Sequence, residues 1–554
     1  INYVNNNSYD TQLGSVVAEE ATSLNVNLKG IMSGTAKVTA NKATSINLNI
    51  DSLDVVAKDL SFEAEKATSM KIVSVQKDSV FKASDNNMKA LQNLDITTAG
   101  RFEFKCDTEK FESLSTINLK GTSEKSSATV IAGTALSIQD INLIADHLQA
   151  TMEKQGYQSL NATLNTQGTI NAFLNNNTQG EVEFNIGNAG SVNVVNNSVN
   201  IQKLVLGSAN STTMVKDSFV VKGGTAHETS VGNISADKIN IDFGQTLGLT
   251  NLQGYLKAND IALKISQITG ASGNINLNIG GARNFKVDID GSVKGDKLDI
   301  SYNGLIAPVI NTVENIKVSG DLGAGYDIYT LDTAGTTDTV RTIDLSGLKN
   351  VEKGTITLDN SNTNLLSLKA TGGDDKVTLI DNMLVNNVAN NVDINLGAGD
   401  DEIITKTLVA NKTVTINGGA GNDLFDVRGS KTDVDASKYV VIGDVSGGDK
   451  IKFDALVQAS GFERVQDNVV KNATTLKEAI NLAIASNQSN SPILNKLFYF
   501  TYAGDTYVVH NATSTAVGTE DTLTAADTVV KLAGVRSDDL ILTADYTEGT
   551  LNIN

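Results

Sequence analysis

The chain has no tryptophan, one cysteine and two prolines among its 554 residues. The single cysteine, Cys106, cannot form a disulfide within the chain, so the fold must be stabilised by packing and by bound ions. Basic residues are also few: 44 Lys and Arg stand against 63 Asp and Glu, for a net charge of −19. This acidity disfavours nucleic acid and anionic membranes as partners and suits divalent cations.

Long apolar runs are missing as well. No stretch approaches the roughly 18 apolar residues of a transmembrane helix, and no amino-terminal segment has the basic start and apolar core of a secretion signal. If the protein is exported, we expect it to use another signal. Because the chain begins at Ile1 rather than at methionine, we also expect that an amino-terminal address or anchor can precede it.

Common enzyme motifs are not found either. His227-Glu228 begins like a zinc-protease helix, but position 231 is valine where the second histidine would stand. Three histidines and one cysteine make no zinc constellation, and neither a G-x-S-x-G elbow nor a Walker phosphate loop occurs. Adjacent acid pairs do occur, but those in glycine-rich turns are explained more simply by ion binding than by acid-base catalysis. We therefore expect no enzymatic activity.

The first half of the chain carries a repeat. Apolar anchor residues recur at intervals of 22, 24, 24, 23, 21 and 22 residues, and a fixed period of this size is typical of a solenoid. Around each anchor apolar and polar residues alternate, which indicates a strand with one buried face. The anchors are Leu24, Ile46, Met70, Leu94, Ile117, Ile138 and Leu160.

This pattern predicts an all-β fold, a right-handed parallel β-solenoid or β-roll with about 22 to 26 residues per coil. The intervening Asn, Lys, Asp and Thr residues should face water or stack in polar ladders. A β-sandwich with evenly spaced strands remains the alternative. A sandwich would have a turn about every 8 to 12 residues, and it would not require the apolar anchors to keep the same position in seven successive repeats.

Glycine-aspartate turns follow in the second half. In the stretch 418–426, which reads G-G-x-G-x-D, Gly419 and Gly421 can take positive φ and turn carbonyls inward. Asp423 then supplies a carboxylate to a hard cation that prefers oxygen ligands. A second copy, Gly397-Ala-Gly-Asp-Asp-Glu-Ile403, lies about one coil earlier. One turn supplies only part of a coordination shell, so two stacked turns are needed.

Weaker copies flank these two. The reference aspartates of four copies, Asp375, Asp401, Asp423 and Asp449, are spaced 26, 22 and 26 residues apart, and Asp327 lies 48 residues before Asp375. A single such turn is an ordinary loop, but five in near register predict calcium binding, most strongly around Asp401 and Asp423. The candidate calcium-binding residues are Gly397, Gly399, Asp400, Asp401, Gly419, Gly421, Asn422, Asp423, Gly372, Asp374, Asp375, Asp449 and Asp327.

The last hundred residues differ in character. Thr475-Leu-Lys-Glu478 is a capping box before a helical pattern at 479–485. Residues 497–509 predict a β-hairpin that turns at Gly504-Asp505, and 527–535 and 538–543 predict further strands, with Asp538-Asp539 as a solvated strand end. We expect these elements to form a cap that protects the open solenoid end from edge pairing. Segments 207–232 and 333–342, rich in Gly, Ser and Thr, predict excursions from the stack.

These motifs resemble a known family. The turn at 418–426 resembles the calcium-binding turn of repeats-in-toxin (RTX) β-rolls. Residues 441–453 resemble the segment that closes RTX repeats, and the chain end resembles an uncleaved type I secretion signal. Together with the Asn- and Thr-rich repeat, the chain resembles the calcium-dependent RTX-type S-layer proteins of Gram-negative bacteria such as Campylobacter and Caulobacter.

The resemblance implies a secreted structural protein that self-assembles, in the presence of Ca²⁺, into a two-dimensional homo-oligomeric lattice on the cell surface. It implies export by the type I secretion machinery and attachment to lipopolysaccharide through a region at or before the amino terminus. An RTX adhesin or passenger module that binds a cell-surface ligand is the alternative, and a secreted hydrolase with its catalytic domain outside this chain is a third reading.

The expected organisation has four parts. They are an N-terminal β-solenoid at 1–206, a continuing solenoid with loop excursions at 207–315, an RTX-like calcium-binding β-roll at 316–455, and a C-terminal cap with the type I secretion signal at 456–554.

Overall fold

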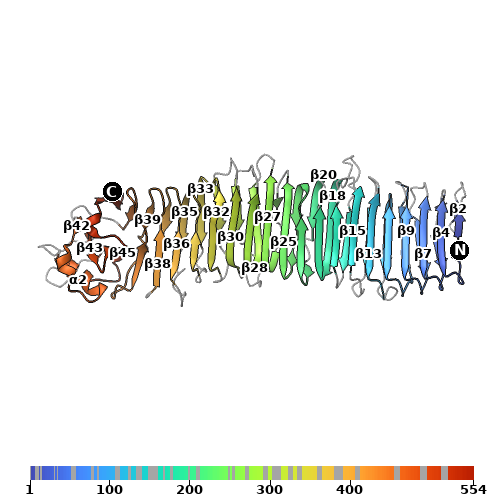
Figure 1. Cartoon of the computed structure of the whole chain (residues 1–554), viewed down its shortest axis with the longest axis horizontal. Helices are drawn as coiled ribbons and strands as arrows, with labels where there is room; N and C mark the ends of the chain where they lie inside the picture. The colour runs from blue at the N-terminus through green and yellow to red at the C-terminus, as the bar shows by residue number, and fades with distance from the viewer. Residues whose placement is uncertain are drawn as a thin grey trace. The chain divides into compact units, whose positions relative to one another are not determined.

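The computed structural model is a β-solenoid of parallel, stacked strands with a β-rich carboxyl-terminal region, as predicted (Figure 1). The chain divides into two compact units, Ile1–Ile279 and Gly280–Asn554. The structure describes the chain except for residues 1, 6–10, 13–14, 30–31, 34, 52–57, 77–79, 84–85, 107–112, 123–126, 133–139, 148–159, 166–168, 175–178, 198–199, 208–211, 247–249, 252–255, 269–273, 291–296, 302–312, 322–327, 333–339, 359–364, 380–390, 406–411, 455–461, 487–495 and 513–521.

Two ladders of parallel strands make up most of the first unit, and successive coils add a strand to each. The first ladder contains, in order, β1 (Asn2–Asn5), β4 (Ser23–Lys29), β7 (Ser45–Asp51), β9 (Ser69–Ser74), β11 (Asn93–Thr98), β13 (Thr116–Thr122), β15 (Asp140–His147), β17 (Thr169–Leu174), β19 (Ser191–Asn196), β22 (Ser218–Lys222), β25 (Lys238–Thr246) and β27 (Leu256–Ile268).

The second ladder contains β3 (Val16–Val17), β6 (Thr35–Thr39), β8 (Lys58–Glu63), β10 (Val80–Ala83), β12 (Arg101–Cys106), β14 (Ser127–Ala132), β16 (Leu160–Asn165), β18 (Gln179–Ala189), β20 (Asn200–Leu206), β23 (Thr225–Val231), β26 (Thr250–Asn251) and β28 (Asn274–Asp290). A short third ladder joins the end of β18 to β21 (Thr213–Val215), β24 (Ile234–Ser235) and β27, and β2 (Thr11–Gln12) pairs with β5 (Met32–Ser33).

The second unit repeats the two-ladder plan. In one ladder the later residues of β28 pair with β30 (Val313–Asp321), followed by β32 (Thr342–Lys349), β34 (Ser367–Lys369), β36 (Val392–Asn395), β38 (Lys412–Asn417) and β40 (Lys438–Ile442). The other contains β29 (Lys297–Ser301), β31 (Ile328–Asp332), β33 (Lys353–Leu358), β35 (Asp374–Leu379), β37 (Glu402–Ile404), β39 (Leu424–Asp426) and β41 (Lys450–Lys452). This second ladder carries the glycine-aspartate turns.

The core lies between the ladders of each unit and is built from every second strand residue, because successive side chains of a strand point to opposite faces. In β7, for example, Ile46, Leu48 and Ile50 are buried and the residues between them are not. The register aligns, coil by coil, the predicted anchors Leu24, Ile46, Met70, Leu94 and Ile117. These five anchors are therefore confirmed.

The last two predicted anchors were wrong. Ile117 pairs with Ile141 of β15 rather than with Ile138, which lies outside the described residues. Leu160 lies in β16, a strand of the second ladder that pairs with β18. Strands of both ladders are equally apolar and alternate along the chain, so spacing alone did not show which ladder a strand joins.

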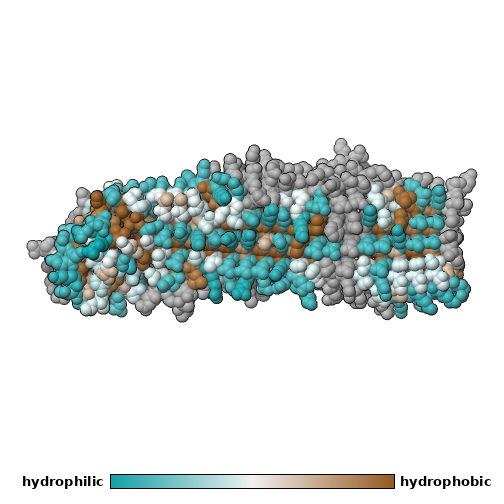
Figure 2. Space-filling view, viewed as in Figure 1, coloured by the Kyte–Doolittle hydropathy of each residue, from teal (hydrophilic) through white to brown (hydrophobic). Residues whose placement is uncertain are grey.

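Polar side chains on the outer face stack in the predicted ladders. Asn47 donates a hydrogen bond from Nδ2 to Oδ1 of Asn25 at 2.8 Å, and Asn49 bonds Asn27 in the same way at 2.8 Å. Each pair spans one coil of 22 residues. Figure 2 shows that hydrophilic residues cover much of the described surface on the visible face.

The carboxyl-terminal region closes the end of both ladders of the second unit. β45 (Thr528–Leu532) pairs in parallel with β40, and β47 (Thr550–Ile553) pairs antiparallel with β41. β45 also pairs with β44 (Asp505–Asn511), which forms a hairpin with β43 (Lys496–Tyr502), while β42 (Phe462–Arg464) pairs with β43 and β46 (Leu542–Asp545) with β47. The predicted cap is thus present, and it covers the free edges of the last coil.

Two short helices pack on the hairpin: α1 (Asp467–Val470) and α2 (Leu476–Ser486). The predicted capping box forms, because the amide of Glu478 donates to Oγ1 of Thr475 at 3.2 Å and the carboxylate of Glu478 accepts the amide of Thr474 at 2.8 Å. The cap has its own core, made of Ala436, Val465, Val470, Ala479, Ile480, Ala483, Ile484, Phe498, Phe500, Tyr507, Leu523 and Val529 among others.

Three local predictions need correction. The hairpin turns at Ala503 and Gly504, both at positive φ, rather than at Gly504-Asp505. Asp538 and Asp539 lie in a 3₁₀ turn, η3 (Ser537–Asp539), where Asp538 pairs with Arg464, and do not begin a strand. Residues 213–231, expected within an excursion, instead contain β21, β22 and β23, because Val215, Phe219 and Val221 continue the buried pattern of the ladders.

No α-helix in the described residues is long and apolar enough to cross a membrane. The expected boundaries at 206, 315 and 455 stay predictions.

Replacement of Ile72 by alanine should loosen the solenoid locally. Ile72 is fully buried and pairs with Leu48 and Ile96 on the neighbouring coils, so we expect a loss of about 2 to 5 kcal/mol. Because coils contact mainly their neighbours, hydrogen exchange should speed up in β7, β9 and β11. The matched control is Lys71→Ala on the exposed face of the same strand, and equal effects of both variants would contradict this account of the core.

Candidate metal site

Two glycine turns stack on one another immediately before β37 and β39. Gly397 and Gly399 of the first turn, and Gly419 and Gly421 of the second, all have positive φ, as the sequence predicts for the second pair. A Cβ on Gly419 would lie 1.8 Å from the carbonyl oxygen of Gly397, and one on Gly421 would lie 1.9 Å from that of Gly399. Only glycine fits here, because the carbonyl of one turn occupies the space beside the next.

The four reference aspartates form a hydrogen-bonded column, which we call the aspartate column: Asp375, Asp401, Asp423 and Asp449. In each step the amide of one aspartate donates to Oδ1 of the aspartate one coil later, at 2.7, 2.9 and 3.0 Å in chain order. All four side chains are buried. The structure therefore brings together the residues that the repeat spacing had aligned.

A second, exposed column ties the same coils in the opposite direction. The amide of Asp400 donates to Oδ1 of Asp374 at 2.9 Å, and the amide of Asn422 donates to Oδ1 of Asp400 at 2.8 Å. Here the later coil donates to the earlier one, whereas in the aspartate column the earlier coil donates to the later. Adjacent turns are therefore joined by hydrogen bonds from amide to carboxylate that run in both directions along the stack.

The two ends of the aspartate column are closed by their own turns. Oδ2 of Asp375 accepts hydrogen bonds from the amide and the hydroxyl of Thr371, at 2.7 and 2.9 Å. Oδ2 of Asp449 accepts the amide of Ser446 at 2.7 Å. At both ends, protein donors already satisfy the second carboxylate oxygen.

The two interior members are different. Oδ2 of Asp401 and Oδ2 of Asp423 are buried, and no described group donates a hydrogen bond to either oxygen. The position that a Cβ of Gly418 would take lies 2.1 Å from Oδ2 of Asp423, so glycine leaves space beside that oxygen. Buried carboxylate oxygens are rarely left without a partner, and such a pair points to a ligand that supplies positive charge.

The local field reinforces this conclusion. Burial raises the pKa of Asp401 to about 7, and the negative charges of Asp375 and Asp423 act in the same direction. Burial likewise raises the pKa of Asp423 to about 6, with contributions from Asp449 and Asp444. A cation between such groups removes both the desolvation cost and the mutual repulsion of the carboxylates.

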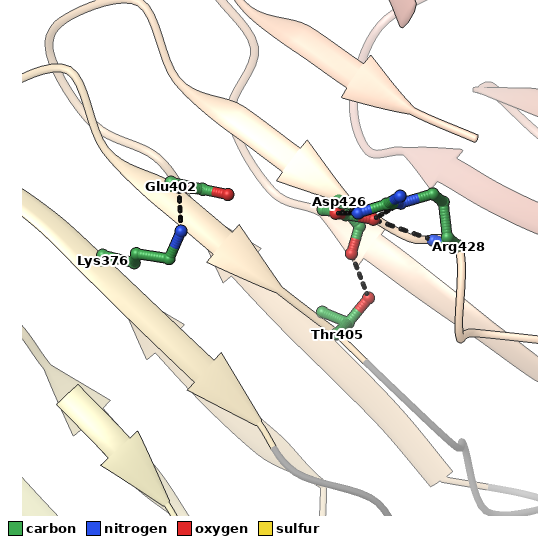
Figure 3. A network of polar contacts seen from close by, with 5 residues as sticks. All are labelled: Lys376, Glu402, Thr405, Asp426 and Arg428. Carbon is green, nitrogen blue, oxygen red and sulfur yellow. Dashed lines mark hydrogen bonds and ion pairs between the residues drawn. The ribbon is translucent and has the colours of Figure 1, made fainter. Parts of the chain in front are cut away.

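Nearby acids are neutralised by basic side chains instead (Figure 3). The buried carboxylate of Asp426 pairs with the guanidinium of Arg428 at 2.6 Å, and its backbone carbonyl accepts the hydroxyl of Thr405 at 3.1 Å. On the outer face Lys376 pairs with Glu402 at 2.7 Å across β35 and β37. Among the described residues, no Lys or Arg forms an ion pair with Asp401 or Asp423.

Sequence reasoning missed Asp444. Its two carboxylate oxygens accept the amides of Gly418 and Gly419, at 2.8 and 3.1 Å, and so hold the glycine turn beside Asp423. Its spacing could have identified it, because Asp444 follows Gly418 by 26 residues, the length of one coil. It does not belong to a G-x-D turn, which is why motif matching passed over it.

The remaining predicted residues divide into three groups. Asp374, Asp400 and Asn422 make the exposed column, and Gly372 begins the shortened turn, where it leaves open space rather than meeting a neighbouring carbonyl. Asp327 lies outside the described residues. His227 and Glu228, which the sequence already excludes as a zinc-protease pair, lie in a strand, β23.

In the part of the chain that the structure describes, no group of three or more His, Cys, Asp or Glu side chains gathers as a metal cluster. A cation at Asp401 and Asp423 would therefore draw its other ligands from backbone carbonyls, which calcium accepts readily. A scan against protein-family models found no match for the chain, and a search of curated proteins found no similar sequence.

The pKa values predict an unusual pH dependence in the presence of a chelator. Because the folded pKa of Asp401 lies above its usual 3.8, the folded state binds the proton more tightly, and stability should rise as pH falls from about 7 toward 4. The slope should approach about 1.4 kcal/mol per pH unit for such a group. Urea unfolding at a series of pH values would measure it.

The Asp401→Asn variant should weaken this pH dependence, most clearly between about pH 6 and 7, because it removes one titrating group and keeps an acceptor for the amide of Asp375. Below about pH 6 the raised pKa of Asp423 should still contribute. Asp393→Asn, on the exposed face of β36 in the same coil, should leave it unchanged. An unaltered slope in Asp401→Asn would show that Asp401 is not the group responsible.

Proposed function

We propose that this chain is a calcium-stiffened structural protein of the bacterial cell surface that assembles into a two-dimensional lattice, as S-layer proteins do. The observation that carries the proposal is the pair of buried carboxylate oxygens, on Asp401 and Asp423 of consecutive coils, to which no group in the described part of the chain donates a hydrogen bond. It is supported by the repeat of the turn, the acidic composition and the solenoid fold.

Calcium suits this site better than a smaller or softer cation. The available ligands are oxygens only, carboxylate and carbonyl, and calcium takes six to eight of them in flexible geometry. Asp401 and Asp423 would hold the ion, with carbonyls of the glycine turns 397–399 and 419–421 completing the shell. Asp444 would act through the turn that it holds.

The proposal narrows the predicted ligand set. Asp375 and Asp449, at the ends of the column, would support the site without binding the ion, because Thr371 and Ser446 already donate hydrogen bonds to their second oxygens. Bound calcium would offset the repulsion between the interior carboxylates and so tighten the contact between neighbouring coils. In a solenoid that contact carries most of the stability, so the ion would stiffen this part of the molecule.

A stiff, acidic solenoid with a regular outer face is suited to a repeating assembly. Hydrogen-bonded asparagine pairs link the outer faces of successive coils, and its net charge of −19 favours association through divalent cations over association with anionic surfaces. Within this proposal the chain leaves the cell by type I secretion, folds outside, and is attached to lipopolysaccharide through a region at or before its amino terminus.

Calcium titration calorimetry tests the site itself. Asp401→Asn and Asp423→Asn should each weaken calcium binding by about tenfold or more, because ligand charge sets the affinity of such sites. Asp375→Asn is the matched control, since it removes an equally buried carboxylate from the same column, and its effect should be several-fold smaller. Equal losses in all three variants would contradict the assignment of the interior pair.

Electron microscopy of the purified chain tests the assembly. We expect ordered sheets with calcium, their dissolution on chelation, and weaker assembly of the double variant Asp401→Ala with Asp423→Ala. Normal sheets in excess chelator would rule out the calcium-dependent lattice. Single particles in calcium, from protein that binds the ion normally, would favour the adhesin alternative.

A further inference from the structure

The joint between the last coil and the cap contains a buried histidine. His510 lies in β44 with no exposed surface, between Leu497 of β43 and Thr528 of β45 in the sheet register. Its ring centroid is 5.8 Å from that of Phe453, directly after β41 in the last coil. His510 therefore lies where the cap meets the coil that it covers.

Neither ring nitrogen of His510 has a hydrogen-bond partner among the described residues. Buried imidazoles normally donate from one nitrogen and accept at the other, so this position is costly for a polar ring. Thr432, whose amide bonds the carbonyl of Asp527 at 2.8 Å across the same joint, also buries an unpartnered hydroxyl oxygen. The joint is thus close-packed but poor in polar partners.

Charged groups of the last coil face this ring. Lys431 forms an ion pair with Asp454 and donates to Oγ1 of Thr528 at 3.3 Å. The carboxylate of Asp527 lies beside β45, where it accepts the amides of Ala512 and Thr524 at 2.8 and 2.7 Å. A proton on His510 would place a second positive charge near Lys431, in a site without an acceptor for the new N–H.

We propose that the joint is an acid-sensitive clasp, in which protonation of His510 releases β44 and β45 from the last coil. The neutral ring packs against Phe453 and holds the cap in place. The charged ring is accommodated only when the joint opens and water reaches it. Acidification would in this way uncover the edge of β40, which pairs with β45 in the closed joint.

The direction of the pH effect follows from the surroundings of the ring. Burial, and then the charge of Lys431, lower the pKa of His510 from 6.5 to about 4, with Asp454 opposing them. The closed joint therefore favours the neutral ring, and the opening equilibrium should rise about tenfold per pH unit as pH falls from about 6.5 to 4. The interior aspartates have the opposite dependence, so the two effects are separable.

Hydrogen exchange on the full chain in excess calcium, corrected for intrinsic rates, tests the clasp between pH 8 and 4.5. Protection of the amides that pair β40 with β45 should fall with the stated slope below about pH 6.5, while β7, β9 and β11 serve as the internal control. His510→Phe keeps a ring against Phe453 and cannot take a proton. In this variant the loss of protection below about pH 6.5, which we call the acid step, should vanish.

A second variant keeps the test decisive if His510→Phe does not fold. Lys431→Met removes the nearby cation and leaves Asp454, so the pKa of His510 in the closed joint should rise, and the acid-induced increase in opening should become smaller and level off at a higher pH. An unchanged step in either variant would overturn the proposal, as would equal loss of protection in β7, β9 and β11. The same step is expected in chelator, so the clasp and the calcium site can fail independently.

Discussion

Everything in this molecule depends on the parallel, in-register pairing of one coil with the next. Within a ladder core residues mostly pair with apolar residues one coil later, as Leu24 pairs with Ile46, and outer polar residues often pair with polar ones, as Asn25 does with Asn47. Apolar residues in the same phase therefore bury one another, and polar residues in the same phase form continuous columns. A single rule of pairing produces both the core and the outer face.

In-register pairing also stacks like charges on one another, and the aspartate column shows which groups stabilise the stacked carboxylates. Backbone amides of neighbouring coils satisfy one oxygen of each interior carboxylate, and Thr371 and Ser446 satisfy the second oxygen at the two ends. Asp426 uses a different solution, an ion pair with Arg428. Within the aspartate column, only Asp401 and Asp423 have an oxygen without such a partner among the described residues, and the proposed calcium function rests on that difference.

The other consequence of open-ended pairing is an exposed edge, which the cap removes. β45 and β47 reach the last coil from far along the chain and pair with it in opposite senses, one parallel and one antiparallel. The cap must therefore pack against a surface that belongs to another element. His510 lies in that contact, where side chains of the cap pack against the last coil and not against another copy of the repeat.

The sequence alone determined the features that depend on local order and period. These are the solenoid, five anchors, the positive φ of Gly419 and Gly421, the capping box and the hairpin, because each follows from periodicity or from the conformational freedom of a few adjacent residues. The coil length was predicted only in part, because the step from Asp140 to Thr169 is 29 residues and the step from Asn284 to Asn315 is 31. The alignment of Asp375, Asp401, Asp423 and Asp449 also followed from their spacing.

Only the tertiary structure decided which ladder Leu160 joins, that Asp444 holds the turn at Gly418, and that the cap closes through β45 and β47. It also showed that the second carboxylate oxygen is hydrogen-bonded in Asp375 and Asp449 but has no described donor in Asp401 and Asp423. The physical reason is that hydrogen-bond satisfaction and desolvation depend on groups one coil or more away, and a motif of nine residues contains no information about them.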